Sequence, residues 1–169
     1  MKILHSVLLL MASSMLSSSF AADDKPYMLS RSLVPAMANE VITAAAVECA
    51  KSGYQVAVAL VDRAGILQGF MRNPLAGSHT VDVSIAKAKT AASFKTATID
   101  MMTNQRLQHL KQAPGVLLLG GGVPILIGGH FYGAIGVSGA PAEKTSGDTD
   151  DRCARAGIEA IREALDFAE

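Results

Sequence analysis

Apolar residues recur every three to four positions in several stretches of the chain, which is the period of an amphipathic helix. Ser32 is a candidate cap for the first of these stretches, and Pro35 stands in its first turn, where a missing N–H is tolerated. Thr80 is the candidate cap of the second stretch, and Thr96 or Thr98 of a shorter third one. The predicted helices cover about residues 33–51, 80–94, 98–109 and 148–168.

Five shorter runs are apolar and bounded by turn signals, which predicts β-strands. The first two flank the turn sequence DRAG, and the last two flank Gly128 and Gly129, a two-residue hairpin turn. The predicted strands cover residues 56–62, 66–72, 115–121, 123–129 and 130–139. Because hairpin-connected strands alternate with helices in groups, this order predicts an α+β fold with a five-stranded antiparallel sheet and flanking helices.

The first 21 residues have the pattern of a secretory signal peptide. Lys2 supplies the positive charge, an apolar run follows from Ile3 to Leu16, and Ser19 and Ala21 are small residues at a cleavage site. We expect cleavage near Ala21 and a periplasmic or secreted protein, with residues 22–169 forming a single domain. The alternative is an uncleaved anchor or a buried helix. We expect no membrane span in the mature chain, because no second apolar run is long enough.

Charge and glycine content exclude two classes of ligand. Lysine plus arginine and aspartate plus glutamate number 15 each, so the chain lacks the basic excess typical of nucleic-acid binding proteins. The glycine-rich stretch 117–141 contains no G-x-x-x-x-G-K-[ST] motif, and Ile125 stands where a dinucleotide fingerprint needs its third glycine. This stretch is predicted to form a β-meander and not a phosphate loop.

The two cysteines, Cys49 and Cys153, lie on the first and the last predicted helix. An exported protein meets an oxidising compartment, so the pair can form a disulfide if the two helices pack antiparallel. Two small buried thiols are the alternative, and the sequence leaves both open. The spacing of the two cysteines does not fit a metal site.

Four separated blocks of the sequence resemble the GlcG/HbpS family of haem-degrading (DUF336) domains, to which the C-terminal domain of PduO-type proteins is related. The blocks occur in the order of the family and cover essentially the whole mature chain. The resemblance implies a profilin-like fold, homo-oligomers and, in several members, the binding of haem. The four blocks are VALVDRAGILQGFMR, SIAKAKTAASF, GGVPI and GAIGVSGA.

His79 is the candidate ligand of the haem iron, because it precedes the second helix in a loop beside a glycine. A surface histidine without a ligand is the alternative. His109 and His130 are expected to be solvent-exposed, and no two histidines have the spacing of a structural zinc site.

Three further residues are candidates for binding haem or another small ligand. Arg72 can pair with a haem propionate or a substrate carboxylate, although an ion pair with Asp62 is the alternative. Asp62 itself is expected to accept hydrogen bonds within its turn. Lys87 shares a helix face with apolar residues, so it is expected to meet an acid of a neighbouring helix or a bound anion. Thr90, one turn after Ala86, is expected to line the same pocket.

These observations favour an exported haem-binding protein that captures, stores or senses haem. A small enzyme or accessory protein acting on haem, or on a hydroxy-acid or diol metabolite, is the alternative, and an oligomer-forming module without a ligand is a third possibility. Signatures of catalysis are weak, because Ser138 does not stand in a G-x-S-x-G motif. Asp148, Asp150 and Asp151 are expected mainly to stabilise the dipole of their helix.

Overall fold

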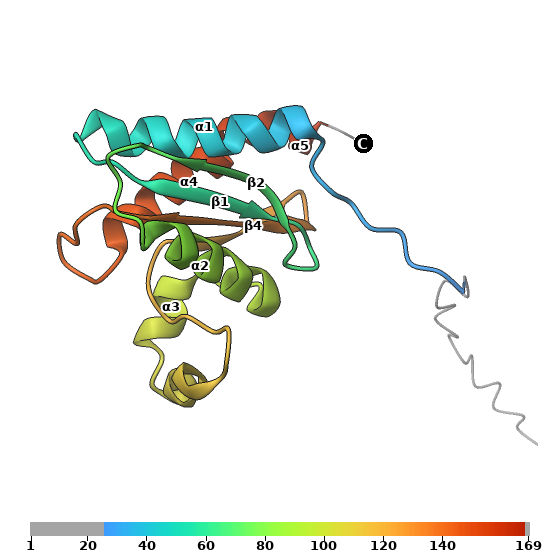
Figure 1. The fold of residues 1–169 in the computed structure, drawn as a ribbon. Coiled ribbons are helices and arrows are strands. Elements are labelled where there is room, and N and C mark those ends of the chain that lie inside the picture. Colours follow the sequence, from blue (N-terminus) through green and yellow to red (C-terminus); the bar gives the residue numbers. More distant parts are fainter. Residues whose placement is uncertain (1–25, 168–169) are drawn as a thin grey trace, which may run out of the picture.

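The computed structural model describes residues 26–167, so the predicted signal peptide and its cleavage site lie outside the described residues. One antiparallel sheet, with strand order β2-β1-β4-β3, lies between two groups of helices. Helices α1 and α4 cover one face, and α2 and α3 lie on the other (Figure 1). The helices are α1 (Pro35–Lys51), α2 (Thr80–Phe94), α3 (Thr98–Thr103), α4 (Asp148–Ala160) and α5 (Arg162–Asp166), with a 3₁₀ helix η1 (Gln105–Gln112). The strands are β1 (Ala57–Val61), β2 (Leu67–Arg72), β3 (Gly122–Ile127) and β4 (His130–Ser138).

Alternate residues of the central strand β1 point to two separate cores. Val58 and Leu60 pack in the larger core with α1 and α4. Ala59 and Val61 pack in a smaller core against the alanines of α2. Gly136 on β4 allows α2 to approach closely, because a Cβ at this position would overlap the backbone of α2. Small residues therefore bring the middle of α2, at Ser84 and Ala88, close to the sheet.

The sheet contains four strands among the described residues, where the sequence predicted five. Residues 116–121 form no strand. The Gly121 carbonyl, next to the start of β3, accepts the N–H of Val137 on β4 at 2.9 Å, and the backbone before it bonds to side chains of helices. The Leu117 N–H donates to Thr90 Oγ1 at 2.9 Å, and Thr98 Oγ1 donates to the Leu119 carbonyl at 2.7 Å. These threonine hydroxyls hold the segment beside α2 and α3, so it forms no strand of the sheet.

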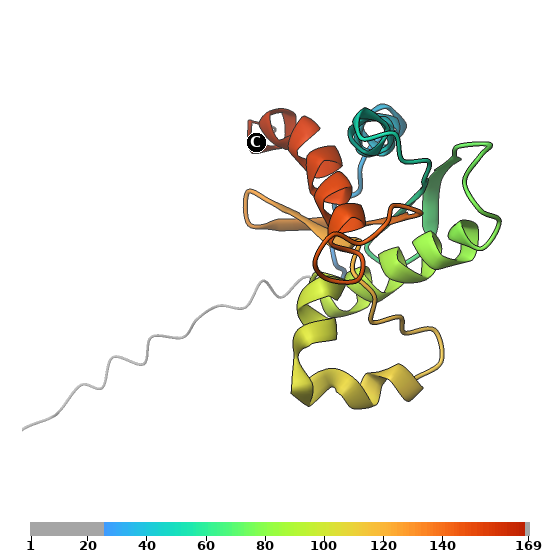
Figure 2. The same ribbon diagram turned by 90° about the vertical axis from the view of Figure 1, so that its left-hand side faces the viewer.

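The helix boundaries differ from the predicted ones where caps were assigned. The first helix begins at Pro35 with no side-chain cap. The hydroxyl of Thr80 donates to the Gly77 carbonyl at 2.7 Å and does not cap its helix. The predicted third helix is divided into α3 and η1, which project away from the sheet (Figure 2). None of the described helices is both long and apolar enough to cross a membrane.

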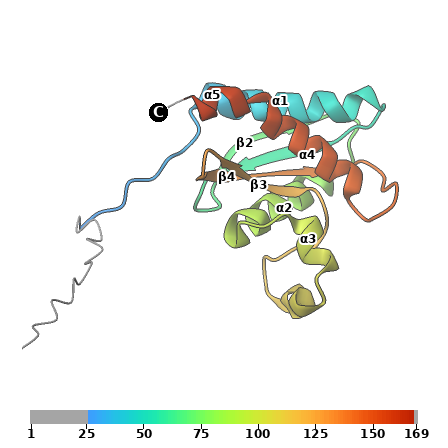
Figure 3. The same cartoon turned by 180° about the vertical axis from the view of Figure 1, so that it is seen from behind.

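A disulfide joins Cys49 of α1 to Cys153 of α4 and settles the alternative that the sequence left open. The two helices lie on the same face of the sheet, where α4 crosses α1 (Figure 3). Their close approach requires Gly157, because a Cβ there would lie 2.6 Å from the Val41 carbonyl oxygen. The disulfide therefore crosslinks the two helices of the larger core.

Candidate functional site

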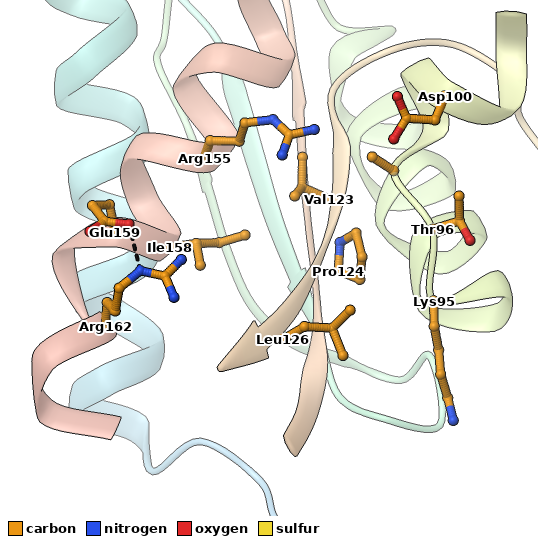
Figure 4. A pocket seen from close by; sticks show the side chains of 11 residues that line it. Lys95, Thr96, Asp100, Val123, Pro124, Leu126, Arg155, Ile158, Glu159 and Arg162 are labelled. Carbon is orange, nitrogen blue, oxygen red and sulfur yellow. Dashed lines mark hydrogen bonds and ion pairs between the residues drawn. The ribbon is translucent and has the colours of Figure 1, made fainter. Parts of the chain in front are cut away.

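A groove of about 510 Å³, here called the β3 groove, runs beside the edge strand β3 (Figure 4). Val123, Pro124 and Leu126 form its apolar floor. Its arginines are already paired on their own side of the groove: Arg155 Nε lies 2.6 Å from Asp151, and Arg162 Nε lies 2.7 Å from Glu159. None of the predicted site residues lines this groove.

A second cavity, of about 260 Å³, brings together two of the predicted residues, His79 and Lys87. We call it the His79 cavity. It lies where the first turns of α2 and α4 meet the end of β4. Its lining residues are His79, Val83, Lys87, Leu119, Ser138, Gly139, Ala140, Ala142, Ser146, Gly147 and Asp150.

A buried ion pair stands at this cavity. Lys87 Nζ donates to Asp150 Oδ2 at 2.7 Å and to the Val137 carbonyl at 2.9 Å. Asp150 Oδ1 accepts the N–H of Ala140 at 3.0 Å. The side chains of Lys87 and Asp150 are 1% and 5% exposed. The prediction that Lys87 meets an acid of a neighbouring helix is therefore confirmed, and the pair connects α2, β4 and α4.

Burial changes the proton affinity of both partners. The pKa of Lys87 is lowered and the pKa of Asp150 is raised, in each case mainly because burial removes water from the charged form. The attraction between the two charges acts in the opposite direction and is the smaller effect. The short distance between Lys87 Nζ and Asp150 Oδ2 therefore favours the charged forms against the effect of burial.

The loop that closes the cavity is held by Asp148. Its carboxylate accepts the backbone N–H groups of Glu143, Lys144 and Thr145 at 2.7–3.0 Å. These hydrogen bonds hold the pKa of Asp148 well below its usual range. Asp148 therefore organises the loop before α4 in addition to stabilising the helix dipole.

His79 is exposed at the rim of the cavity, immediately before α2. Within residues 26–167, neither ring nitrogen takes part in a hydrogen bond, so both are available to a ligand. The same described residues contain no group of three or more His, Cys, Asp or Glu arranged to hold a metal ion. Any iron bound at His79 would therefore have to bring most of its other ligands with it, as haem does.

Arg72 and Thr90 lie outside the His79 cavity. Arg72 Nη1 donates to the carbonyls of Asn73, Pro74 and Ala76 at 2.5–3.2 Å, so the side chain organises its own loop. Arg72 and Asp62 form no ion pair. Asp62 Oδ1 instead accepts the N–H groups of two residues of its turn, at 2.8 and 2.9 Å, which confirms its predicted role.

Sequence reasoning missed two residues of the cavity, Asp150 and Ser138. Asp150 precedes Cys153, Ala154 and Gly157 by three, four and seven positions, and these residues share the buried face of α4. A carboxylate on an apolar helix face needs a partner, and this was the available signal. For Ser138 no comparable signal exists, because its exposure to the cavity depends on the loop that follows β4.

The fold and the His79 cavity define the class of the protein: a small α+β protein with one antiparallel sheet and a polar pocket at the start of two helices. Residues 33–159 match the model of the family described as "Haem degrading protein HbpS-like". The match covers most of the chain, so the chain belongs to the HbpS-like family.

Known relatives agree with this assignment. Protein GlcG of Escherichia coli strain K12 is 33% identical over 104 residues, which are 60% of this chain and 78% of GlcG. The crystal structure of HbpS is 34% identical with a TM-score of 0.74, over 83% of this chain and 98% of HbpS. A structure of PduOC in complex with heme is 26% identical with a TM-score of 0.68, over 77% of this chain and 95% of PduOC.

Proposed function

We propose that this protein is an exported haem-binding protein of the GlcG/HbpS type, which captures, stores or senses haem. The observation that carries the proposal is the position of His79, an exposed imidazole at the rim of a cavity in a chain of the HbpS-like family. The heme complex of the relative PduOC supports the same ligand class. The profilin-like fold that the sequence resemblance implied stays a prediction.

The residues at the cavity fit one edge of a haem group. His79 would offer a ring nitrogen as a ligand, and a bound haem would supply the iron. The cavity, at about 260 Å³, is smaller than the roughly 300–1,000 Å³ of pockets that enclose a drug-sized ligand. Most of the macrocycle would therefore lie outside it. Arg72 remains the predicted partner of a propionate, and Thr90 supports the site indirectly by holding Leu117.

Export is part of the proposal and rests on two features. The first 21 residues have the pattern of a cleavable signal peptide. The disulfide between Cys49 and Cys153 is typical of proteins that function in an oxidising compartment, such as the periplasm or the extracellular space. Both features favour a protein that meets haem outside the cytoplasm.

An absorption titration of the mature protein with hemin tests the haem site. We expect a saturable Soret shift at about one haem per chain, with His79 as ligand. Loss of outer-sphere partners costs about 10–100-fold in metal affinity, so the His79→Ala variant, which lacks the ligand itself, is expected to lose at least as much.

The matched control is His109→Ala, because His109 is also exposed but lies on η1, away from the cavity. It should titrate like the unmodified protein. An unchanged spectrum and affinity in His79→Ala would remove this residue from the site, and the absence of any saturable shift would refute haem binding.

We also propose that the protein forms homo-oligomers through the edge strand β2. Every residue of β2 is exposed or half-buried, and its outer edge has no partner strand within the described chain. Three apolar side chains of β2 itself are partly exposed: Leu67, Phe70 and Met71, at 44%, 38% and 41%. An exposed apolar edge strand is a typical site of association between chains.

Light scattering after size-exclusion chromatography measures this association. We expect a mass that is a multiple of the mature chain, and a shift towards the monomer in Phe70→Glu, since a buried interfacial carboxylate without a partner is costly. Phe94→Glu is the control, because Phe94 is similarly exposed, at 39%, but lies at the end of α2 and not on an edge strand. A monomeric unmodified protein would contradict the proposal.

A further inference from the structure

The His79 cavity contains hydrogen-bond donors that the protein itself does not use. The ammonium of Lys87 has three N–H groups, and two are bonded, to Asp150 and to the Val137 carbonyl. Ser138 is only 5% exposed and lines the cavity, yet its hydroxyl makes no hydrogen bond with residues 26–167. Among the described residues, Asp151 Oδ1 is the fully buried side-chain atom without a partner, so the Ser138 hydroxyl is reached from the cavity. There it and the third N–H of Lys87 can donate to an acceptor that belongs to a ligand.

The ion pair is more than a device for stability. Replacing a buried ion pair by apolar residues is often neutral or stabilising, so packing alone does not require Lys87 and Asp150. The surrounding backbone also makes room for the ammonium. A Cβ at Gly121, where φ is +111°, would lie 3.0 Å from Lys87 Nζ and 2.7 Å from Asp150 Cβ. The glycine thus leaves space for the two charged side chains beside the cavity, where an apolar side chain could otherwise pack.

The charges at the cavity favour a ligand with a single negative charge. Both oxygens of Asp150 are occupied, by Lys87 and by the N–H of Ala140, so this carboxylate faces its partners. Lys87 balances Asp150, and the remaining positive potential comes from the first turn of α2, a helix of 15 residues. A dianion would exceed this modest potential, whereas one carboxylate offers two acceptor oxygens for two unused donors.

The size and the apolar lining define the rest of the ligand. A volume of about 260 Å³ admits a molecule of a few carbon atoms. Val83, Leu119 and Ala142 provide apolar contacts beside the polar groups. We propose that the His79 cavity binds a short-chain monocarboxylate, whose carboxylate accepts hydrogen bonds from Lys87 and Ser138 and whose alkyl part contacts these apolar side chains. This site does not depend on the binding of haem.

Propionate is the probe, and NMR titration of the ¹⁵N-labelled mature protein without haem is the measurement. We expect saturable shifts at the amides of Val83, Gly139 and Ala140, and much weaker binding of propionamide, which has the same shape without the charge. Ser138→Ala should weaken propionate binding about tenfold or more, because hydrogen bonds to charged groups are among the strongest in proteins. Its fold should be unaffected, because the hydroxyl has no protein partner within the described residues.

Ser93→Ala is the matched control, since Ser93 lies exposed near the far end of α2. It should bind propionate like the unmodified protein. A second variant, Lys87→Met with Asp150→Asn, removes the pair without leaving a lone charge and should also abolish binding. The absence of saturable shifts, or equal affinity in Ser138→Ala and Ser93→Ala, would overturn the proposal.

Haem propionates carry the same carboxylate chemistry, so the titration is repeated on protein loaded with hemin or with its dimethyl ester. Unchanged propionate binding under both conditions assigns the site to a free acid. Competition by hemin but not by the ester assigns the carboxylate to a haem propionate. Either result supports a carboxylate site. Both experiments are interpreted only after propionate binding has been observed in the haem-free protein.

Discussion

Replacing Lys87 by methionine is expected to lower the free energy of unfolding by about 3–5 kcal/mol, the usual cost of removing one partner of a buried ion pair. The substitution leaves the carboxylate of Asp150, whose side chain is 5% exposed, without its ammonium partner. The N–H of Ala140 remains to satisfy one oxygen, but the other loses its hydrogen bond. Urea denaturation followed by circular dichroism measures this loss at pH 7.

The double variant Lys87→Met with Asp150→Asn separates the lost pair from the stranded charge. An amide oxygen at position 150 can still accept the N–H of Ala140, and no charge remains buried. We expect this variant to recover at least half of the stability that the single variant loses. Equal losses in the two variants would show that the cost comes from packing and not from the unpaired carboxylate.

The dependence on pH gives an independent check of the Lys87→Met variant. Burial raises the pKa of Asp150 in the folded protein, and removal of Lys87 is expected to raise it further. A carboxyl group whose pKa is higher in the folded than in the unfolded state stabilises the fold at low pH, and this stabilisation is lost as the pH rises. The difference between variant and unmodified protein should therefore shrink from pH 7 to pH 4. The double variant Lys87→Met with Asp150→Asn, in which neither buried group can titrate, should show no such change.

Local patterns predicted most of the fold. The hairpin of β1 and β2, the turn at Gly128 and Gly129, and the four principal helices all follow from hydrophobic period and turn chemistry. The segment 115–121 has the composition of a strand, and yet it forms no strand of the sheet. The hydroxyls of Thr90 and Thr98 hold it in its position, because they form hydrogen bonds with its backbone across 27 and 21 residues of sequence. No local pattern contains that information.

The candidate site was predictable in part for the same reason. Lys87 could be recognised because helical period places it on a buried face, and an amine there requires a partner. His79 immediately precedes α2 and Lys87 lies about two helical turns further on, so their common cavity follows from local geometry. Asp150 and Ser138 join them only through the packing of α4 and β4, which brings together residues separated by 63 positions between Lys87 and Asp150. The loop arginine Arg72 was assigned by chemistry alone, and the structure places it at a different surface.

Loss of the disulfide is the second large effect that we expect. Cys49 and Cys153 are separated by 104 residues, and both side chains are buried. In the chain-entropy model, closing a loop of this length stabilises the folded state by about 4–5 kcal/mol, and native disulfides typically contribute about 2–5. The variant with both cysteines changed to alanine should therefore lose about 3–5 kcal/mol. The expected fall in melting temperature is roughly 9–15 °C, since one kcal/mol corresponds to about 3 °C in a domain of this size.

Reduction of the unmodified protein provides the matched control for this prediction. Under dithiothreitol its melting temperature should fall towards that of the double variant, whereas the variant itself should not respond to the reductant. The helices α1 and α4 would still pack through Gly157, so the reduced protein should keep its fold at low temperature with lower stability. Equal melting temperatures of the oxidised and reduced protein would mean that the crosslink adds little to this packing. A large difference would mean that the protein reaches its full stability only in an oxidising compartment. The predicted signal peptide is expected to direct the chain to such a compartment.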